Sequence, residues 1–445
     1  MKIALFVHCF FPEHFYGTET YTLELASNLI AMGHEPVIVS AVFQGEATRK
    51  SVITRYEYMH IPVYCLDKNY CSHHTVRETY YQSDLLELHK QLLFEIKPDL
   101  VHVTHLINHT ASLLDATKEL GIPAIATLTD FFGICFNNRL EAADGSLCSG
   151  PNADRTNCLT CYLKAQADVT AGLLGRCPSS LSAIAQVLSF ATQIPGIRHG
   201  RLAGLVADIA DRPDILLNRY AVYQATIAPT CFLKRAYLAN GLSAPLHVMH
   251  FGVDVPRTPK ATPRVDAPVK FGYIGQIAPH KGTDVLVDAF VRLPSGNAEL
   301  HIYGSEDQDP EFVSRLKDKA ARTPVFFQGT FPKDQLADVF LGIDFLVIPS
   351  RWYENSPLVL LNSLATHTPV IVSDVEGMTE FVKDGTNGFV FLRGNVDDLE
   401  RVLRRVVQDP ELIEKMSKTT EYNHTTREMT EEVFSIYKSI VKIDA

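Results

Sequence analysis

Short apolar runs rich in β-branched residues alternate along this chain with longer amphipathic stretches, and this alternation restricts the fold more than any other feature. In the first half the runs are KIALFVH, PVIVSAV, DLVHVTH, PAIATLT and, more weakly, ATIAPT. Amphipathic segments at 20–31, 83–95 and 111–119 separate the earlier runs. Because strands buried on both faces lack polar alternation, the pattern predicts parallel sheets that are covered by helices.

A second series of the same kind follows, with the runs VKFGYIG, ELHIYG, PVFFQG, DFLVIPS, PVIVSD and GFVFL. Between the two series, residues 250–268 are rich in proline and lack apolar periodicity, which is typical of a linker. A length of 445 residues suits two or three domains. The sequence therefore predicts an α/β protein with two doubly wound, Rossmann-like domains, 1–256 and 257–420, that face each other across a cleft. A helix at 421–445 is expected to pack back toward the first domain.

Composition and charge limit the partners. A hydrophobic content of 46% with 21% charged residues is typical of a soluble globular protein. The apolar N-terminal run ends at Pro12 without a small-residue cleavage site, which favours a buried strand over a signal peptide. A net charge of -10 argues against nucleic acid as a partner, because such binding depends on Lys and Arg. We therefore expect a cytoplasmic protein.

The stretch PSRWYENSPLVLLNSLA places polar residues at the start of an apolar helix, directly after the strand-like run FLVIPS. Ser356 suits the N-cap and Pro357 the first turn, so the free N–H groups of this helix are predicted to hold a diphosphate. Glu354 and Asn355 lie at its mouth, and Asn362 lies two turns further on. In the alternative interpretation, Glu354 only complements the helix dipole, an effect of about 0.3–1 kcal/mol.

Lys281 and Gly282 occupy the equivalent place after the run VKFGYIG. This is not a P-loop, because the lysine precedes its glycine. A lysine at the carboxyl end of a strand suits a phosphate contact, although a lone surface lysine is more often only solvated. Together the two stretches predict one diphosphate between two helix starts.

The order of these motifs resembles one family over nearly the whole chain. The second half carries GYIGQIAPHKGTD, HIYG, FQGTFPKDQLADVF, DFLVIPSRWYENSPLVLLNSLA and PVIVSDVEGMTEFVKDGTNGFVF, and the first half carries FFPEHFYGTETYTLELASNLIAMGHEPVIVS. This series is similar to that of the retaining glycosyltransferases of family 4, also called glycosyl transferases group 1, which have the GT-B fold.

The resemblance implies a hexosyltransferase-like enzyme. It would move a sugar from a UDP- or GDP-linked donor to a glycan or lipid-linked acceptor, with retention at the anomeric carbon and no catalytic metal, in cell-surface polysaccharide synthesis. The first domain would bind the acceptor and the second the donor. Glu354 would contact the sugar hydroxyls, Lys281 the diphosphate, and Gly17 would let the backbone approach the donor phosphate. The further donor-binding residues implied are Gln276, Asn355, Ser356, Pro357, Leu358, Val359 and Asn362.

Four positions depart from the family pattern, and the first is Tyr16, which precedes Gly17 where the family has paired glycines. Asn362 replaces the second carboxylate of a Glu-x7-Glu pair, Gln276 replaces an arginine, and Thr129 replaces a histidine before Asp130. We expect Asp130 or His105 to take over part of the catalytic role of that histidine, although a strand-end histidine such as His105 is commonly structural. The departures leave two alternatives open: a catalytically degenerate nucleotide-sugar-binding or regulatory protein, and a sugar-nucleotide epimerase of the same fold.

A cysteine-rich loop interrupts the first domain, within an insertion at about 131–215. Cys135, Cys148, Cys158 and Cys161 follow the spacing C-x12-C-x9-C-x2-C. Four thiolates in a polar loop predict a structural zinc site or, less typically, an iron–sulfur cluster; the alternative is two incidental cysteine pairs. The stretch 171–207 has no acidic residue and three arginines, so it is predicted either to cover the domain core or to contact the inner face of the membrane.

Overall fold

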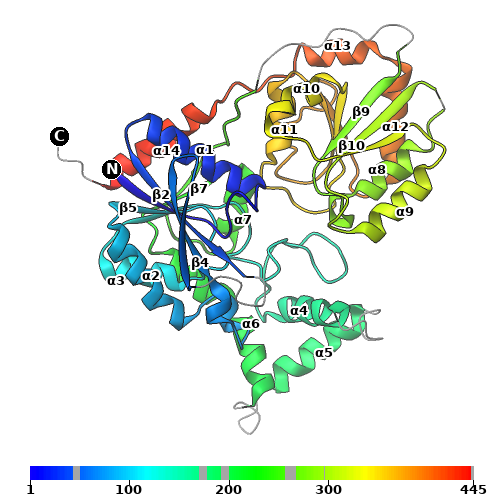
Figure 1. Ribbon diagram of the computed structural model, residues 1–445. Coiled ribbons are helices and arrows are strands. Elements are labelled where there is room, and N and C mark those ends of the chain that lie inside the picture. Colours follow the sequence, from blue (N-terminus) through cyan, green and yellow to red (C-terminus); the bar gives the residue numbers. More distant parts are fainter. Residues whose placement is uncertain (44–50, 170–177, 192–199, 256–266, 295, 442–445) are drawn as a thin grey trace. The chain divides into compact units, whose positions relative to one another are not determined.

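The computed structural model describes residues 1–43, 51–169, 178–191, 200–255, 267–294 and 296–441. Chain contacts divide the protein into two compact units, one formed by Met1–Met249 with Met429–Ala445 and the other by His250–Glu428 (Figure 1). The domain boundaries expected from the sequence were 256/257 and 420/421, a few residues from these divisions. Within the described residues, no helix is both long and apolar enough to cross a membrane.

The first unit is built on an eight-stranded sheet of order β3-β4-β2-β1-β5-β6-β7-β8. All neighbouring strands are parallel except β3 and β4. The apolar runs predicted from sequence form five of the strands. The edge strand β3 alternates half-buried and exposed residues, so it lacks the continuous apolar run that identified those five. The strands are β1 (Lys2–Phe6), β2 (Glu35–Val42), β3 (Ile53–Tyr58), β4 (Ile61–Asp67), β5 (Leu100–Val103), β6 (Ala124–Thr127), β7 (Ala225–Ala228) and β8 (Leu246–Val248).

Helices cover both faces of this sheet. Figure 1 shows α1 and α14 on one side and α2 and α3 on the other. Helix α14 is fixed by Tyr437, whose hydroxyl lies 2.6 Å from Nδ1 of the buried His102 on β5. The bounds are α1 (Gly17–Ala31), α2 (Ser83–Ile96), α3 (Ser112–Leu120), α4 (Thr156–Val169), α5 (Pro178–Ala191), α6 (Arg201–Tyr220), α7 (Cys231–Ala239) and α14 (Thr426–Ile440), with 3-10 turns Lys68–Cys71 and Arg77–Thr79.

The second unit has a six-stranded sheet of order β11-β10-β9-β12-β13-β14, and all its strand pairs are parallel. Its apolar core combines strand residues with the inner faces of the covering helices. The prediction of two parallel-sheet α/β units is thus confirmed. The elements are β9 (Val269–Ile274), α8 (Thr283–Phe290), β10 (Ala298–Tyr303), α9 (Pro310–Ala320), β11 (Val325–Gly329), α10 (Leu336–Leu341), β12 (Phe345–Ile348), α11 (Leu358–Ala365), β13 (Val370–Ser373), β14 (Gly388–Phe391), α12 (Val396–Gln408) and α13 (Glu411–Ser417), with 3-10 turns Pro279–Lys281 and Lys333–Gln335.

Candidate functional site

The central strands β9 and β12 of the second unit pair in parallel, so their carboxyl ends lie at the same edge of the sheet. The loop after β9 forms the 3-10 turn Pro279–Lys281 and then reverses at Gly282, whose φ is +73°. A Cβ at Gly282 would lie 1.9 Å from the backbone oxygen of Pro349, which follows β12. The two loops are therefore in direct contact, and only glycine permits their approach.

Glu354 accepts three hydrogen bonds on one carboxylate oxygen. Its Oε1 lies 2.7 Å from Lys281 Nζ, 2.8 Å from Ser350 Oγ and 3.0 Å from Trp352 Nε1. The side chains of Lys281 and Glu354 are 24% and 10% exposed. In the described part of the chain Oε2 has no hydrogen-bond partner, and it is not sealed from solvent. The carboxylate is thus fixed through one oxygen and open to a ligand through the other.

Trp352 forms a wall beside this ion pair. Its ring centroid lies 4.2 Å from that of His280, and Lys281 Nζ lies 5.0 Å from the indole ring. The sequence-based prediction included neither Trp352 nor Ser350. The available signal was their position two and four residues before Glu354, in the same loop after a buried strand.

The start of α11 differs from the prediction. The helix begins at Leu358 with Pro357 at the N-cap position and no side-chain cap. Ser356 has a φ of +58°, outside the extended conformation of an N-cap residue, so the prediction that Ser356 caps the helix and Pro357 opens its first turn is wrong. Ser356 Oγ is buried and has no hydrogen-bond partner among the described residues. The helix start therefore offers uncapped N–H groups, with Leu358 and Val359 in its first turn, beside an unsatisfied hydroxyl.

The other predicted donor residues make fewer contacts. Gln276 is half-buried after β9, and its backbone oxygen accepts the Tyr273 hydroxyl. Asn362 is half-buried in α11, and its backbone oxygen accepts the Thr366 hydroxyl. The side chains of Gln276 and Asn362 form no hydrogen bond within the described residues. Asn355, also half-buried, adjoins Glu354 in the loop before α11. The structure thus joins Lys281 to Glu354, but does not bond Gln276 or Asn362 to that pair.

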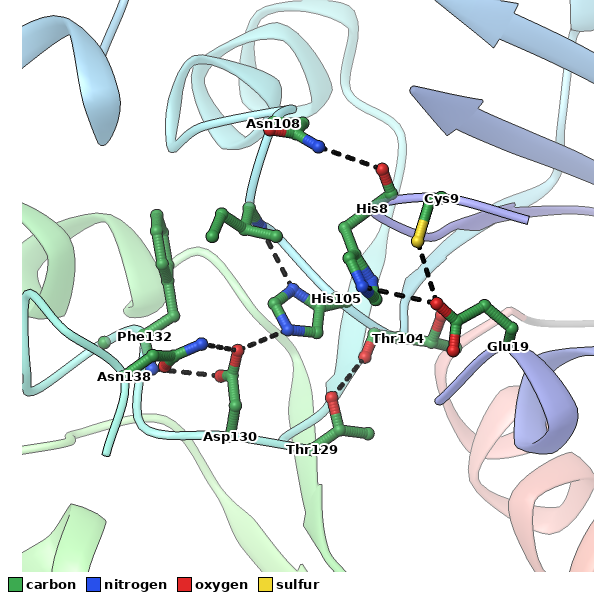
Figure 2. Close-up of polar contacts among 12 residues, drawn as sticks. His8, Cys9, Glu19, Thr104, His105, Asn108, Thr129, Asp130, Phe132 and Asn138 are labelled. Carbon is green, nitrogen blue, oxygen red and sulfur yellow. Dashed lines mark hydrogen bonds and ion pairs between the residues drawn. The ribbon is translucent and has the colours of Figure 1, made fainter. Parts of the chain in front are cut away.

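In the first unit, His105 and Asp130 follow the neighbouring strands β5 and β6 and form a close pair (Figure 2). The distance from His105 Nε2 to Asp130 Oδ2 is 2.5 Å. The backbone N–H of Ile107 donates to His105 Nδ1, so Nε2 carries the proton shared with Asp130. Both ring nitrogens of His105 are therefore engaged. This arrangement suits a positioning role better than that of a free base.

Asp130 is held by three donors. Besides His105, Asn138 Nδ2 donates to Oδ2 at 2.7 Å and the Phe132 N–H donates to Oδ1 at 3.0 Å. Burial by itself would raise the pKa of Asp130, but the electrostatic interaction with His105 and these hydrogen bonds outweigh burial and lower the pKa to about 2. The carboxylate is ionised at neutral pH.

A second polar cluster adjoins this pair. The ring of His8 lies against that of His105, with centroids 4.1 Å apart, and His8 Nε2 lies 3.4 Å from Oε1 of the buried Glu19 (Figure 2). Cys9 donates its thiol proton to the same oxygen at 2.8 Å, and burial followed by the charge of Glu19 raises the pKa of Cys9. Glu19 Oε2 and His8 Nδ1 are buried without partners in the described chain. Sequence analysis missed this cluster; a glutamate on the apolar helix that follows Gly17 was the available signal.

Gly17 is the first residue of α1. Its φ is not positive and a Cβ there would meet nothing within 4 Å, so neither backbone strain nor packing requires a glycine. Open space at a helix start is compatible with the predicted close approach of a ligand.

The four predicted metal ligands belong to the loop after β6 and to α4, and all four are free thiols. Among the described residues, the ligand atoms of His8, Cys9 and Glu19 all lie within 4.8 Å of one another. The sulfurs of the four cysteines do not meet this criterion, so they are more widely spread. The His8–Cys9–Glu19 group contains a protonated thiol that already donates to the carboxylate, so hydrogen bonding accounts for its close approach.

Two family models match separate parts of the chain. A family model described as glycosyl transferases group 1 matches residues 254–422, and a model of glycosyltransferase family 4 matches residues 15–140. The α-D-kanosaminyltransferase of Streptomyces kanamyceticus is 26% identical over 147 residues, which cover 33% of this chain and 38% of that enzyme. Matches to the first curated relatives span only 35–46% of those relatives' lengths.

Solved structures also match along nearly the whole chain. Sucrose-phosphate synthase from Thermosynechococcus elongatus gives a TM-score of 0.65 at 15% identity and covers 99% of this chain and 98% of its own. The Anabaena protein HepE in complex with UDP-glucose gives a TM-score of 0.64 at 14% identity and covers 99% of this chain and 100% of its own. At such low identity these similarities show the fold alone.

Proposed function

The chain belongs to the GT-B glycosyltransferases, and from that premise we propose that it transfers a sugar from a nucleoside-diphosphate sugar to a glycan or lipid-linked acceptor with retention of the anomeric configuration. The observation that carries this proposal is the anchored carboxylate of Glu354, which leaves Oε2 open beside the uncapped start of α11. One oxygen locked by three donors holds the other oxygen in a fixed direction. A sugar hydroxyl that donates to Oε2 would meet a preorganised acceptor.

The diphosphate would bind to cationic and N–H groups of the same loops. Lys281 uses one hydrogen-bond direction on Glu354 and has others for a phosphate oxygen. The first N–H groups of α11 and the Ser356 hydroxyl add neutral donors. As the nucleoside diphosphate departs, its negative charge increases, and donors already in place stabilise the transition state without reorganisation. Gly17 would admit the donor phosphate to the start of α1.

We propose that the donor is a UDP- or GDP-linked sugar, and the HepE complex with UDP-glucose supports the uridine nucleotide. We assign His105 and Asp130 to the acceptor side as positioning residues. Their closed hydrogen bonding would fix the ends of β5 and β6 while the acceptor hydroxyl is aligned. No catalytic metal takes part in the proposed reaction.

We further propose that the acceptor is lipid-linked, as in cell-surface polysaccharide synthesis, and that α5 contacts the inner face of an anionic membrane. Ile184, Val187 and Phe190 on α5 are 36%, 66% and 71% exposed, while Leu181 and Ala185 are buried. The sequence from 169 to 207 carries no acidic residue. An exposed apolar stripe without negative charge fits an anionic lipid surface. Residues 170–177 and 192–199 of this stretch lie outside the described chain.

Vesicle sedimentation tests the membrane contact. The protein should co-sediment with anionic phosphatidylglycerol vesicles, and Val187→Glu combined with Phe190→Glu should abolish co-sedimentation. Phe94→Glu is the matched control, because Phe94 is 74% exposed on α2, and it should behave as wild type. Equal binding by the α5 variant, or no binding by wild type, contradicts the membrane proposal.

A donor panel tests the transfer itself. Thermal shift with UDP- and GDP-sugars should reveal a ligand, because a ligand present at 100 times its dissociation constant raises the free energy of unfolding by about 2.7 kcal/mol. With that donor and a lipid extract as acceptor source, Glu354→Gln should lower kcat/KM about a hundredfold. Lys317→Met, which removes another ion-paired lysine of the same unit, should leave it unchanged.

The alternatives predict other outcomes. Donor binding without turnover would identify a degenerate, regulatory binding protein. Conversion of the donor without any acceptor would identify an epimerase. An NMR spectrum of the product with inverted anomeric configuration would contradict retention, and the absence of a shift with every nucleotide sugar would overturn the proposal.

A further inference from the structure

Four cysteines take no part in the proposed transfer. Cys135 and Cys148 lie in the loop after β6, and Cys158 and Cys161 lie three residues apart on α4, where this spacing places them on one face. All four are partly buried and none forms a disulfide. Between the first two, Glu141 and Leu147 pair in a short antiparallel bridge, and the Cys148 N–H donates to the Leu140 oxygen at 2.7 Å.

Hydrogen bonds link the loop cysteines to the helix cysteines. Cys135 Sγ donates to Asn137 Oδ1 at 2.7 Å, Asn137 Nδ2 donates to the Glu141 oxygen at 3.4 Å, and Cys161 Sγ lies 3.8 Å from that same oxygen. The loop backbone at Glu141 is therefore shared by Cys135 and Cys161.

Cys148 is linked to α4 in a similar way. The Gly150 N–H points to Cys148 Sγ at 3.3 Å, and Asn157 Nδ2, next to Cys158, approaches it at 3.9 Å. N–H groups directed at a sulfur stabilise a thiolate, and such outer contacts commonly orient metal ligands.

The loop adopts backbone conformations that the surrounding structure has to impose. Three of its non-glycine residues, Asn138, Leu140 and Arg155, have positive φ values of 65°, 50° and 60°. Conformations of this kind persist only when the surrounding structure imposes them. The restraints on this segment include the short bridge at Glu141, the contact of Asn240 Nδ2 with the Ser149 oxygen and the Arg155–Asp214 ion pair.

We propose that Cys135, Cys148, Cys158 and Cys161 bind one zinc ion in a closed, structural site. Four thiolates without an open position suit a structural rather than a catalytic zinc. Zinc–sulfur bonds of about 2.3 Å require a tighter cluster than the sulfurs now form, so binding would draw the four sulfurs closer together.

The site would also support the His105–Asp130 pair. Asn138, three residues after Cys135, donates to Asp130 Oδ2 at 2.7 Å. A metal that fixes both ends of this loop would hold Asn138 on Asp130. The functional value of this support rests on the proposed function, in which His105 and Asp130 are positioning residues. The proposal that the four cysteines bind zinc does not depend on it.

The test measures metal and thiols independently of activity. Protein expressed with added zinc and purified under reducing conditions should contain one zinc ion per chain by elemental analysis. Cobalt substitution should give the absorption bands of a tetrahedral thiolate site. Alkylation followed by mass spectrometry should find these four cysteines protected until a chelator or a mercurial reagent removes the metal, and reactive thereafter.

Variants assign the ligands. Cys148→Ser and Cys158→Ser should retain less than about a tenth of the wild-type zinc. Cys231→Ser, which alters an exposed thiol on α7, should retain all of it. If the ligand variants fail to fold, the alkylation pattern of the wild type still decides.

Three results would overturn the proposal. The first is wild-type protein without zinc whose four cysteines react at once. The second is zinc that survives in Cys148→Ser but is lost in Cys9→Ser, which would place the ion at the His8–Cys9–Glu19 group. The third is iron with labile sulfide in place of zinc, which would assign an iron–sulfur cluster.

Discussion

The Lys281–Glu354 pair allows a quantitative test, because the only tryptophan of the chain reports on it directly. Trp352 Nε1 donates to Glu354 Oε1 at 3.0 Å, so indole fluorescence should follow both the integrity of this site and donor binding. We consider a double-mutant cycle of Lys281→Met and Glu354→Gln. Glutamine retains an acceptor for Ser350 and Trp352 but removes the charge that Lys281 needs.

The expected coupling free energy follows from the geometry. Two unit charges about 4 Å apart attract by about 4 kcal/mol at an effective dielectric constant of about 20, and desolvation cancels much of this. A hydrogen bond to a charged group contributes about 1.5–3 kcal/mol net. With Glu354 at 10% and Lys281 at 24% exposure, solvent screens the pair only partly. We therefore expect a coupling of about 1–3 kcal/mol.

Urea unfolding followed by Trp352 fluorescence measures this coupling for the second unit. The matched control is the cycle of Lys317→Met and Glu306→Gln, a pair in the same unit whose side chains are 46% and 34% exposed. Exposed pairs contribute about 0.2–1 kcal/mol, so the control coupling should be smaller. A coupling below about 0.3 kcal/mol for the site pair, or one equal to the control, would refute the assignment of a fixed carboxylate.

Three further predictions concern the two units separately. The pKa of Asp130 in the folded protein is about 2, below the ordinary value, so ionised Asp130 contributes its full stabilisation above pH ~4. As the pH falls from ~4 to ~2, the free energy of unfolding of the wild type should decrease by about 2 kcal/mol. Denaturation measured at several pH values should show no such decrease for Asp130→Asn. Tyr437→Phe leaves His102 Nδ1 without its partner, should cost about 1–3 kcal/mol, and should speed hydrogen exchange in α14; unchanged exchange would contradict this docking. Gly377→Ala, whose Cβ would lie 1.5 Å from a backbone oxygen, should abolish donor binding in calorimetry, whereas Gly394→Ala, also at positive φ but in open space, should keep it.

The sequence predicted what depends on local pattern. Continuous apolar runs identified the buried parallel strands, and because His105 and Asp130 follow adjacent runs of this kind, their proximity was predictable from topology. Glu354 and Lys281 were predicted at one diphosphate site on the same grounds. Their ion pair is consistent with that placement.

Features that depend on tertiary contacts were not predictable. Ser356 has the residue type of an N-cap, but the loop places it at positive φ. Residues far apart in sequence impose that loop conformation: Gly377 lies against the backbone oxygen of Glu354. The convergence of Ser350 and Trp352 on one carboxylate oxygen likewise depends on side-chain directions that no spacing rule gives.

The proposed donor-binding side chains differ in how firmly hydrogen bonds hold them, and this difference should affect donor specificity. Glu354, assigned to the sugar, is fixed by three hydrogen bonds, whereas Gln276 and Asn362, which stand where the family has charged residues, form none with their side chains in the described chain. A prearranged polar group rejects ligands that leave it unpaired, while adaptable amides tolerate alternatives. We therefore expect donor affinity to change more between epimeric sugars on one nucleotide than between UDP and GDP carrying one sugar. Calorimetry with both series measures this difference, and stronger discrimination between nucleotides than between sugars would contradict the role given to Glu354.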